Sequence, residues 1–142
     1  MTENVATLLA YDCWALLEGA DVARVAWLGP DGVALVPINY VVADGCLWFR
    51  TEPGSALARE SGGGPLVIEI DHVDTETRDG WSVVVRGKPE LIDQIDVPQM
   101  VVEMRVWPIG PHQLFVRVQP DQITGRRLWG TGPVEGDAHA GA

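Results

Sequence analysis

The chain has 142 residues, 46% of them hydrophobic and 21% charged, which is typical of a globular protein large enough for one domain with its own core. No apolar run approaches the ~20 residues of a membrane span, and the acidic N-terminus lacks the basic start of a secretory signal, so we expect a cytoplasmic protein without a membrane partner. Twenty acidic against ten basic residues give a formal net charge of −10, which argues against nucleic acid as a partner.

The first third of the chain reads as one helix followed by three strands. Residues 11–19 (YDCWALLEG) have apolar side chains at helical spacing, with Asp12 as a candidate N-cap and Gly19 as the end of the helix. The turn sequences GPDG and ADG then separate three strands, at residues 22–28, 33–42 and 46–51. Pro37 inside the second strand indicates an edge, a bulge, or a place that something other than a neighbouring strand approaches.

The rest of the chain adds three strands and two helices. A short helix (SALARE) is followed by the loop SGGG, and a second helix begins near Pro98. The strands are predicted at residues 65–71, 81–92 and 112–119. Six strands, joined mostly as hairpins at the start, predict an antiparallel β-barrel with peripheral helices. We assign residues 1–130 to this domain and residues 131–142, rich in Gly and Ala, to a flexible tail.

The junction CLWFRTEPGS, residues 46–55, has the composition of an anion site. On a strand, Arg50 and Thr51 point to opposite faces, and Pro53 suits the first turn of a following helix. A guanidinium, the hydroxyls of Thr51 and Ser55 and free amides at a helix start can together bind a phosphate. The same residues also fit a helix capped by Thr51 with Arg50 on the surface, and the fragment alone favours this second interpretation.

Two further stretches suggest a flat ligand. In GWSVVVRG, Trp81 can cover a planar molecule, although a core position is the commoner role for such a residue, while Ser82 and Arg86 share the opposite face. In VPINY, Pro37 and Asn39 leave backbone polar groups for a hydrogen-bonding ligand such as a flavin, with a bulge as the plainer alternative.

The sequence contains no recognisable catalytic or metal-binding motif. GxSxG, HExxH and the P-loop are absent, and no catalytic nucleophile or general base can be named. Cys13 and Cys46 lack metal-ligand spacing and are predicted to be buried free thiols. If the protein is an enzyme, a cofactor must carry the chemistry.

The ordered series VARVAWLGPDGVALVPINYVVADGCLWFRT, GSALA, LVIEID and GWSVVVRGKPEL resembles the pyridoxamine 5′-phosphate oxidase-like family, which has the FMN-binding split-barrel fold. The likeness extends over residues 12–128 and is to the small actinobacterial members related to the nitroimidazole reductases. It implies a homodimer that binds FMN, or a deazaflavin, in clefts at the subunit interface.

The resemblance also implies which positions hold the cofactor. Main-chain groups of one strand would contact the ring, the junction would hold the phosphate, and a neighbouring strand and the C-terminal segment ITGRRLWG would close the site. The matching positions are Pro37, Ile38 and Asn39 for the ring, Arg50, Thr51 and Ser55 for the phosphate, Trp81 and Ser82 on the neighbouring strand, and Arg127 and Trp129 in the C-terminal segment.

One position departs from the family pattern and leaves several functions open. Ser55 stands where relatives commonly have lysine or histidine, and losing that cation costs on the order of 1–3 kcal/mol of phosphate affinity. The leading hypothesis is a flavin-dependent oxidoreductase that passes electrons from a reduced nicotinamide to a small oxidised substrate, such as a nitro compound or quinone. The alternatives are a non-catalytic flavin, deazaflavin or haem module, with His72 or His112 as haem ligand, and a degenerate barrel with an empty cleft.

Overall fold

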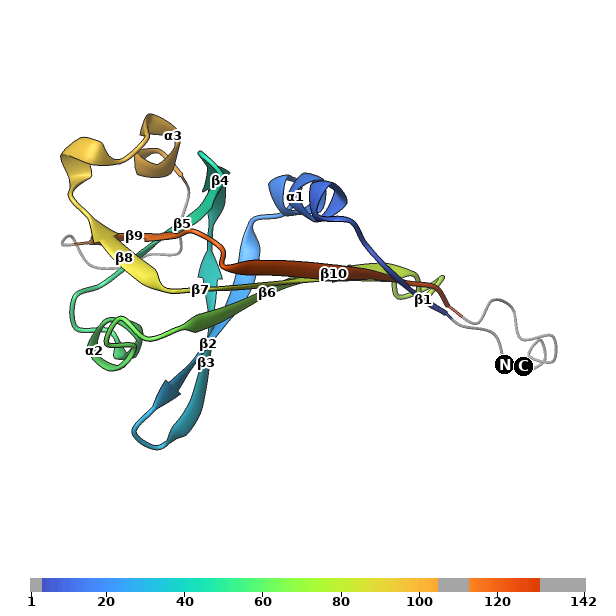
Figure 1. The fold of residues 1–142 in the computed structure, drawn as a ribbon, viewed down its shortest axis with the longest axis horizontal. Coiled ribbons are helices and arrows are strands. Elements are labelled where there is room, and N and C mark those ends of the chain that lie inside the picture. The colour runs from blue at the N-terminus through green and yellow to red at the C-terminus, as the bar shows by residue number, and fades with distance from the viewer. Residues whose placement is uncertain (1–3, 105–112, 131–142) are drawn as a thin grey trace.

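The computed structural model describes residues 4–104 and 113–130, which form ten strands, three α-helices and one 3₁₀ helix (Figure 1). In chain order these are β1 (Val5–Thr7), α1 (Ala10–Glu18), β2 (Val22–Gly29), β3 (Gly32–Asn39), β4 (Val41–Ala43), β5 (Cys46–Thr51), α2 (Ala56–Glu60), β6 (Leu66–Val73), β7 (Gly80–Gly87), β8 (Pro89–Ile92), η1 (Gln94–Asp96), α3 (Gln99–Val102), β9 (Leu114–Val118) and β10 (Gln122–Leu128). The predicted mainly β class is confirmed, whereas the predicted number of six strands is wrong. The predicted flexible tail, residues 131–142, lies outside the described residues.

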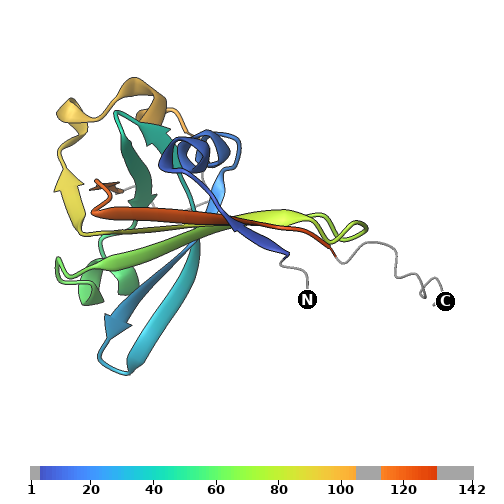
Figure 2. The ribbon, with the colours of Figure 1, turned by 45° about the vertical axis from the view of Figure 1, so that its right-hand side comes forward.

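The strands form two antiparallel sheets. One sheet has six strands in the order β1-β10-β7-β6-β2-β3, and the other has four in the order β4-β5-β9-β8. Three helices lie at the periphery, with α1 against β10, α2 near β2 and α3 beside β4 (Figures 1 and 2). This arrangement confirms the expected barrel with peripheral helices.

The predicted strand 33–42 is two strands that meet at a corner between the sheets. It breaks at Tyr40, between the end of β3 and the start of β4. The Tyr40 amide donates to the Asp21 carbonyl (3.1 Å), and its buried hydroxyl donates to the Leu17 carbonyl (2.6 Å). Both bonds fix the corner to the chain around the end of α1, and burial raises the pKa of the Tyr40 hydroxyl.

The predicted strand 81–92 turns a similar corner at Lys88, between β7 and β8. Gly87 makes this corner tight, because a Cβ at this position would lie 2.7 Å from the Gln119 carbonyl oxygen. The neighbouring Arg86 carbonyl accepts a hydrogen bond from the Asp121 amide (2.7 Å). The strand therefore leaves the six-stranded sheet at a residue without a side chain, which allows the segment at Gln119 to pass close to it.

Strands β1 and β10 had no predicted counterpart. The sequence of β10, QITGRRL, has large apolar side chains only at Ile123 and Leu128, so its alternation is too sparse to indicate a strand. It is extended because it pairs with β7 from Gln122 to Leu128, and because β1 pairs with its other edge. Tertiary pairing, not local propensity, forms these strands.

The core lies between the two sheets and under the helices. Its largest fully buried side chains are Trp48, Tyr40, Phe49, Leu17, Leu47, Leu66, Ile68, Ile70, Val25, Val83, Val85 and Val101. The predicted buried free thiols are confirmed, since Cys13 and Cys46 are both buried and unpaired, and burial raises the pKa of each thiol.

The helices agree with the sequence in place but not in every boundary. Helix α1 begins at Ala10 after Leu9, so Asp12 lies in its first turn and the prediction of Asp12 as N-cap is wrong. Gly19 ends this helix and Pro98 precedes α3, as predicted. In the described part of the chain, every helix is too short or too polar to cross a membrane.

Helix α1 packs closely on β10 at Gly125, and this contact is testable. A Cβ on Gly125 would lie 2.6 Å from the Cys13 sulfur, so we expect Gly125→Ala to lower the free energy of unfolding by about 1–3 kcal/mol in urea titrations. Gly54→Ala is the matched control, since a Cβ there meets nothing within 4 Å, and it should leave the stability unchanged or raise it by up to about 1 kcal/mol. Adding Cys13→Ala should recover part of the loss, whereas equal effects at Gly54 and Gly125 would contradict the close packing.

Candidate functional site

The junction between β5 and α2 brings two predicted hydroxyls together. Thr51 Oγ1 and Ser55 Oγ lie 2.8 Å apart, and Ser55 Oγ accepts a hydrogen bond from the Ala58 amide (3.2 Å). Ser55, not Thr51, is therefore the N-cap of α2, which corrects the alternative interpretation of the junction. Two adjacent hydroxyls at the end of a strand can donate to an anion if they reorient.

Arg50 lies on the opposite face of β5 and does not join these hydroxyls. Its Nη1 and Nη2 donate to the carbonyls of Val102 (3.3 Å) and Met104 (2.7 Å), and its guanidinium carbon lies 5.9 Å from the centre of the Phe115 ring. Its Nε is buried and has no hydrogen-bond partner among the described residues, and burial lowers the pKa of Arg50. The expected meeting of Arg50 with Thr51 and Ser55 is wrong, because side chains alternate along a strand. Its role as a cofactor ligand stays a prediction.

Arg59 supplies a cation at this junction that the sequence interpretation missed. Its Nε donates to the Gly54 carbonyl (3.1 Å), which places the guanidinium back at the start of α2. Helical side chains lean toward the N-terminus of their helix, so a residue four positions after Ser55 can reach the first turn. The four-residue spacing between Ser55 and Arg59 is the sequence feature that could have predicted this contact. The side chain is exposed, and it forms no ion pair within the described ranges.

Strand β3 carries the second predicted group at the edge of the six-stranded sheet. Pro37 and Asn39 point to the outer face, where they lie opposite Arg24 and Val22 of β2, whereas Ile38 points inward and is buried. The pairing of β3 with β2 is continuous, so Pro37 marks an edge strand and not a bulge. Because the Ile38 side chain is buried, this residue can offer a ligand only its main-chain groups.

The third predicted pair, Trp81 and Ser82, lies on opposite faces of strand β7. Ser82 lies on the outer face opposite Asp71, whereas Trp81 lies on the other face in a row with His72 and Arg127. Trp81 is half-buried against the core, beside a shallow hollow of about 480 Å³ that His72 also lines. The structure therefore does not bring Trp81 and Ser82 to one ligand face within a single chain.

The remaining candidates lie at the end of the chain. Trp129 follows β10, is 46% exposed, and donates from its amide to the Asn4 carbonyl (3.0 Å). Arg127 is exposed on β10. His112, one of the two haem-ligand candidates, lies outside the described residues. Among the residues that are described, no three His, Cys, Asp or Glu side chains are placed to hold a metal ion.

The outer face of the six-stranded sheet is electrostatically different from the rest of the protein. Arg24 Nη1 bonds to Glu69 Oε1 (2.9 Å) and Asp71 Oδ2 (3.2 Å). Arg86 and Arg126 lie on the same face and are exposed. Three arginines thus face two acids in a chain with twice as many acids as bases, which favours an anionic ligand here.

Desolvation, and then the neighbouring Asp71 carboxylate, raise the pKa of Glu69 to about 7 from its ordinary 4.5, against the opposing effect of Arg24. A raised carboxyl pKa stabilises the folded state below pH 4.5, and this contribution is lost as the pH rises through about 7. We therefore expect Glu69→Gln to gain stability relative to the natural protein between pH 5 and 8, measured by urea unfolding as a function of pH. The exposed Glu18→Gln is the control, and parallel pH profiles for the Glu69 variant and the natural protein would show that the carboxyl titrates normally.

Comparison with known proteins supports one family. The profile of the family described as pyridoxamine 5′-phosphate oxidase matches residues 10–127. The chain is similar to a solved FAD-binding protein from Mycobacterium smegmatis, with 33% identity and a TM-score of 0.73 over 87% of this chain and 97% of that one. It is also similar to a solved putative pyridoxamine 5′-phosphate oxidase from Corynebacterium glutamicum, with 25% identity and a TM-score of 0.73 over 92% and 98% of the two chains.

An uncharacterized protein of Mycobacterium tuberculosis, Rv0080, is 30% identical over 122 residues, which cover 80% of this chain and 78% of that protein. The match to the family profile covers nearly all of the described barrel, from the start of α1 to Arg127 in β10. The sequence relationship and the architecture agree, and this chain belongs to the pyridoxamine 5′-phosphate oxidase family.

Proposed function

We propose that this protein is a homodimeric flavoprotein that binds FMN and acts as a flavin-dependent oxidoreductase on a small oxidised substrate. The observation that carries the proposal is its similarity, over nearly the whole barrel, to a solved FAD-binding protein. FMN would supply the electron transfer, and the residues of this chain would bind and orient it.

The residues at the β5–α2 junction fit a phosphate. Arg59 offers the guanidinium that Ser55 does not provide, and the hydroxyls of Thr51 and Ser55 lie within one turn of it. A charged donor together with neutral hydroxyls is the usual composition of a phosphate site. We assign the phosphate of FMN to this junction.

The edge of the six-stranded sheet fits a flat heterocycle. Among the strands that the structure describes, β3 has a neighbour on one side only, so its outer edge presents main-chain groups to a ligand or a partner. Pro37 and Asn39 lie on the outer face of this strand, and Ser82 lies on the same face of the sheet on β7, with β2 and β6 between the two strands. We assign the ring of FMN to this region.

A second copy of the chain would complete the site. Trp81 and Arg127 face away from Pro37 and Ser82, so a single chain presents these candidates on two sides of one sheet. The β2–β3 hairpin, which extends away from the barrel (Figure 2), carries an apolar row on its outer face: Leu28, Val33 and Leu35 are 77%, 78% and 63% exposed. Such a row favours burial against a partner.

A flavin carrier without turnover is the second candidate. It is favoured by the described part of the site, which shows hydroxyls and guanidiniums for binding but no paired nucleophile and base. Oxidation of NADH or NADPH by the FMN-loaded protein in the presence of a quinone or nitroaromatic acceptor separates the two functions. Retained FMN without any such oxidation would favour the carrier.

The dimer is tested on the exposed hairpin. We expect the natural protein to have twice the mass of its 15.4 kDa chain in light scattering at micromolar concentration, and Leu35→Glu to shift it to the monomer, because a carboxylate would be buried at the interface. Ile95→Glu is the matched control, since Ile95 is 90% exposed on η1, away from the hairpin. A natural protein that is monomeric, or a Leu35 variant that still dimerises, would contradict the proposed interface.

The phosphate assignment is tested by comparing two ligands and two arginines. We expect Arg59→Gln to lower the affinity for FMN at least about fivefold, since hydrogen bonds to charged groups contribute about 1.5–3 kcal/mol, and to leave riboflavin binding unchanged. We expect Arg50→Gln to lower the free energy of unfolding by about 1–3 kcal/mol, because it removes donors from two carbonyls, and to affect both ligands alike. Fluorescence titration measures both affinities. If Arg50→Gln weakened the binding of FMN but not of riboflavin, the phosphate would have to be assigned to Arg50 instead.

A further inference from the structure

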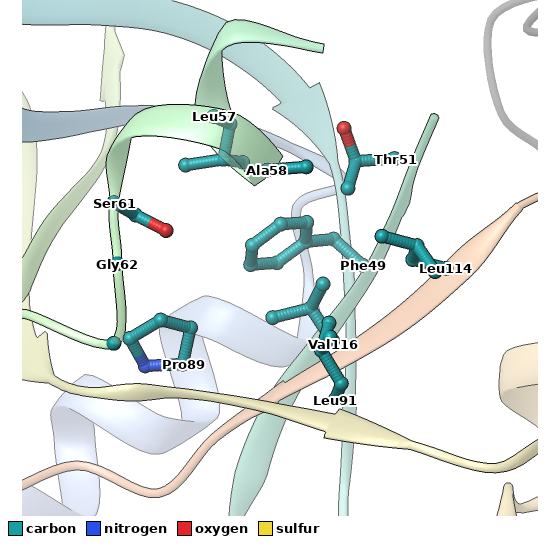
Figure 3. A pocket seen from close by; sticks show the side chains of 11 residues that line it. Phe49, Thr51, Leu57, Ala58, Ser61, Gly62, Pro89, Leu91, Leu114 and Val116 are labelled. Carbon is teal, nitrogen blue, oxygen red and sulfur yellow. The ribbon is translucent and has the colours of Figure 1, made fainter. Parts of the chain in front are cut away.

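A cavity lies at the end of the barrel, between α2, β5, β8 and β9 (Figure 3). Its volume is about 310 Å³. Most of its wall is apolar, formed by Phe49, Leu57, Pro89, Leu91, Leu114 and Val116. Small-molecule sites are typically concave, mostly apolar and about 300–1,000 Å³ in volume, so this cavity is at the small end of that range.

The cavity has a fixed floor and an open rim. Phe49, Leu57 and Val116 belong to the core and are 0%, 5% and 3% exposed. Leu91, on β8, is 67% exposed and lies at the solvent side. A ligand can therefore reach a preformed apolar floor without opening the barrel.

The wall of the cavity carries no charge. None of the eleven described residues that line it is acidic or basic, although the chain has twenty acidic and ten basic residues. Transfer of a charged group into such a wall without a partner is strongly unfavourable. The cavity is thus unsuited to a phosphate or a carboxylate and selects neutral molecules.

One polar group points into the cavity. The Ser61 hydroxyl is directed toward its interior (Figure 3), and no hydrogen bond to it is formed by the residues that the structure describes. The main chain of Ser61 is satisfied, since its amide donates to the Leu57 carbonyl (3.1 Å) and its carbonyl accepts from the Gly64 amide (2.7 Å). Thr51, by contrast, is already paired with Ser55. Ser61 is the free donor and acceptor of this wall.

We propose that this cavity is a second ligand site, which binds a small neutral aromatic molecule through apolar contacts and a hydrogen bond from Ser61 to a hydroxyl or carbonyl of the ligand. The occupant follows from the volume, the uncharged wall and the single free hydroxyl. The site adjoins the proposed phosphate site of FMN, because Thr51 lines the cavity and also contacts Ser55 at the β5–α2 junction, but its apolar floor and Ser61 are not part of that assignment.

The first test uses the neutral dye N-phenyl-1-naphthylamine, whose fluorescence rises in apolar surroundings. We expect the full-length protein to bind the dye, and Ala58→Phe, which fills the cavity from α2, to weaken binding at least about tenfold, since about 1.4 kcal/mol corresponds to a factor of ten. Leu91→Trp narrows the exposed rim and gives a second variant if the first fails to fold. Ala10→Phe, at the exposed start of α1, is the matched control and should bind the dye normally.

The second test isolates Ser61. We expect 2-naphthol to displace the dye several-fold more strongly than naphthalene, and Ser61→Ala to abolish this preference without changing naphthalene binding, since only the hydrogen bond is removed. Three outcomes would overturn the proposal: dye binding that Ala58→Phe and Leu91→Trp leave unchanged, displacement of the dye by FMN, and a dye signal that falls as the protein self-associates. A dye signal that falls on self-association would indicate that the cavity is covered by a second copy of the chain. If the protein bound the dye but not FMN, the proposed function would be contradicted and this second site would still be supported.

Discussion

Successive side chains of a β-strand point to opposite faces, and in this protein that alternation decides what each strand gives to the core, to the helices and to the outside. In β5 it sends Phe49 into the core and Arg50 to the carbonyls at the end of α3. Thr51, the next residue, returns to the side of Ser55 and α2. The same rule places Pro37 outside and Ile38 inside on β3, and it divides Trp81 from Ser82 on β7.

A binding site assembled under this rule draws on more than one surface. The junction of β5 and α2 provides hydroxyls and the guanidinium of Arg59, and the outer face of the six-stranded sheet provides an edge strand and an excess of arginine. The Arg50 guanidinium, which is the most buried of the candidate cations, stabilises the carbonyls of Val102 and Met104 instead. An acidic protein can thus gather positive charge locally without changing its net charge.

The sequence predicted the fold class and most strand positions because alternating valine-rich runs and glycine turns carry that information directly. It failed where the structure depends on contacts distant in the sequence. The corner at Tyr40 follows from hydrogen bonds to Asp21 and Leu17, and β10 is extended because β1 and β7 flank it. Composition could not indicate either feature.

The candidate site was predicted less well, for a related reason. Thr51 and Ser55 were found because they are close in sequence, whereas the destination of Arg50 depends on α3, about fifty residues later. Arg59 was missed although its spacing from Ser55 was visible. The cavity that Ser61 lines could not be foreseen, since its wall combines β5 and α2 with β8 and β9, which come much later in the sequence.

The cap of α2 couples the candidate anion site to the helix itself. The Ser55 hydroxyl that faces Thr51 also accepts the Ala58 amide, and Arg59 reaches back to the Gly54 carbonyl, so the same few atoms begin the helix and face any anion. A bound anion would compete for these hydrogen bonds or reinforce them. Deuterium uptake at the Ala58 amide would then report occupancy of the site directly, and this short helix would be an indicator of ligation as well as a part of the scaffold.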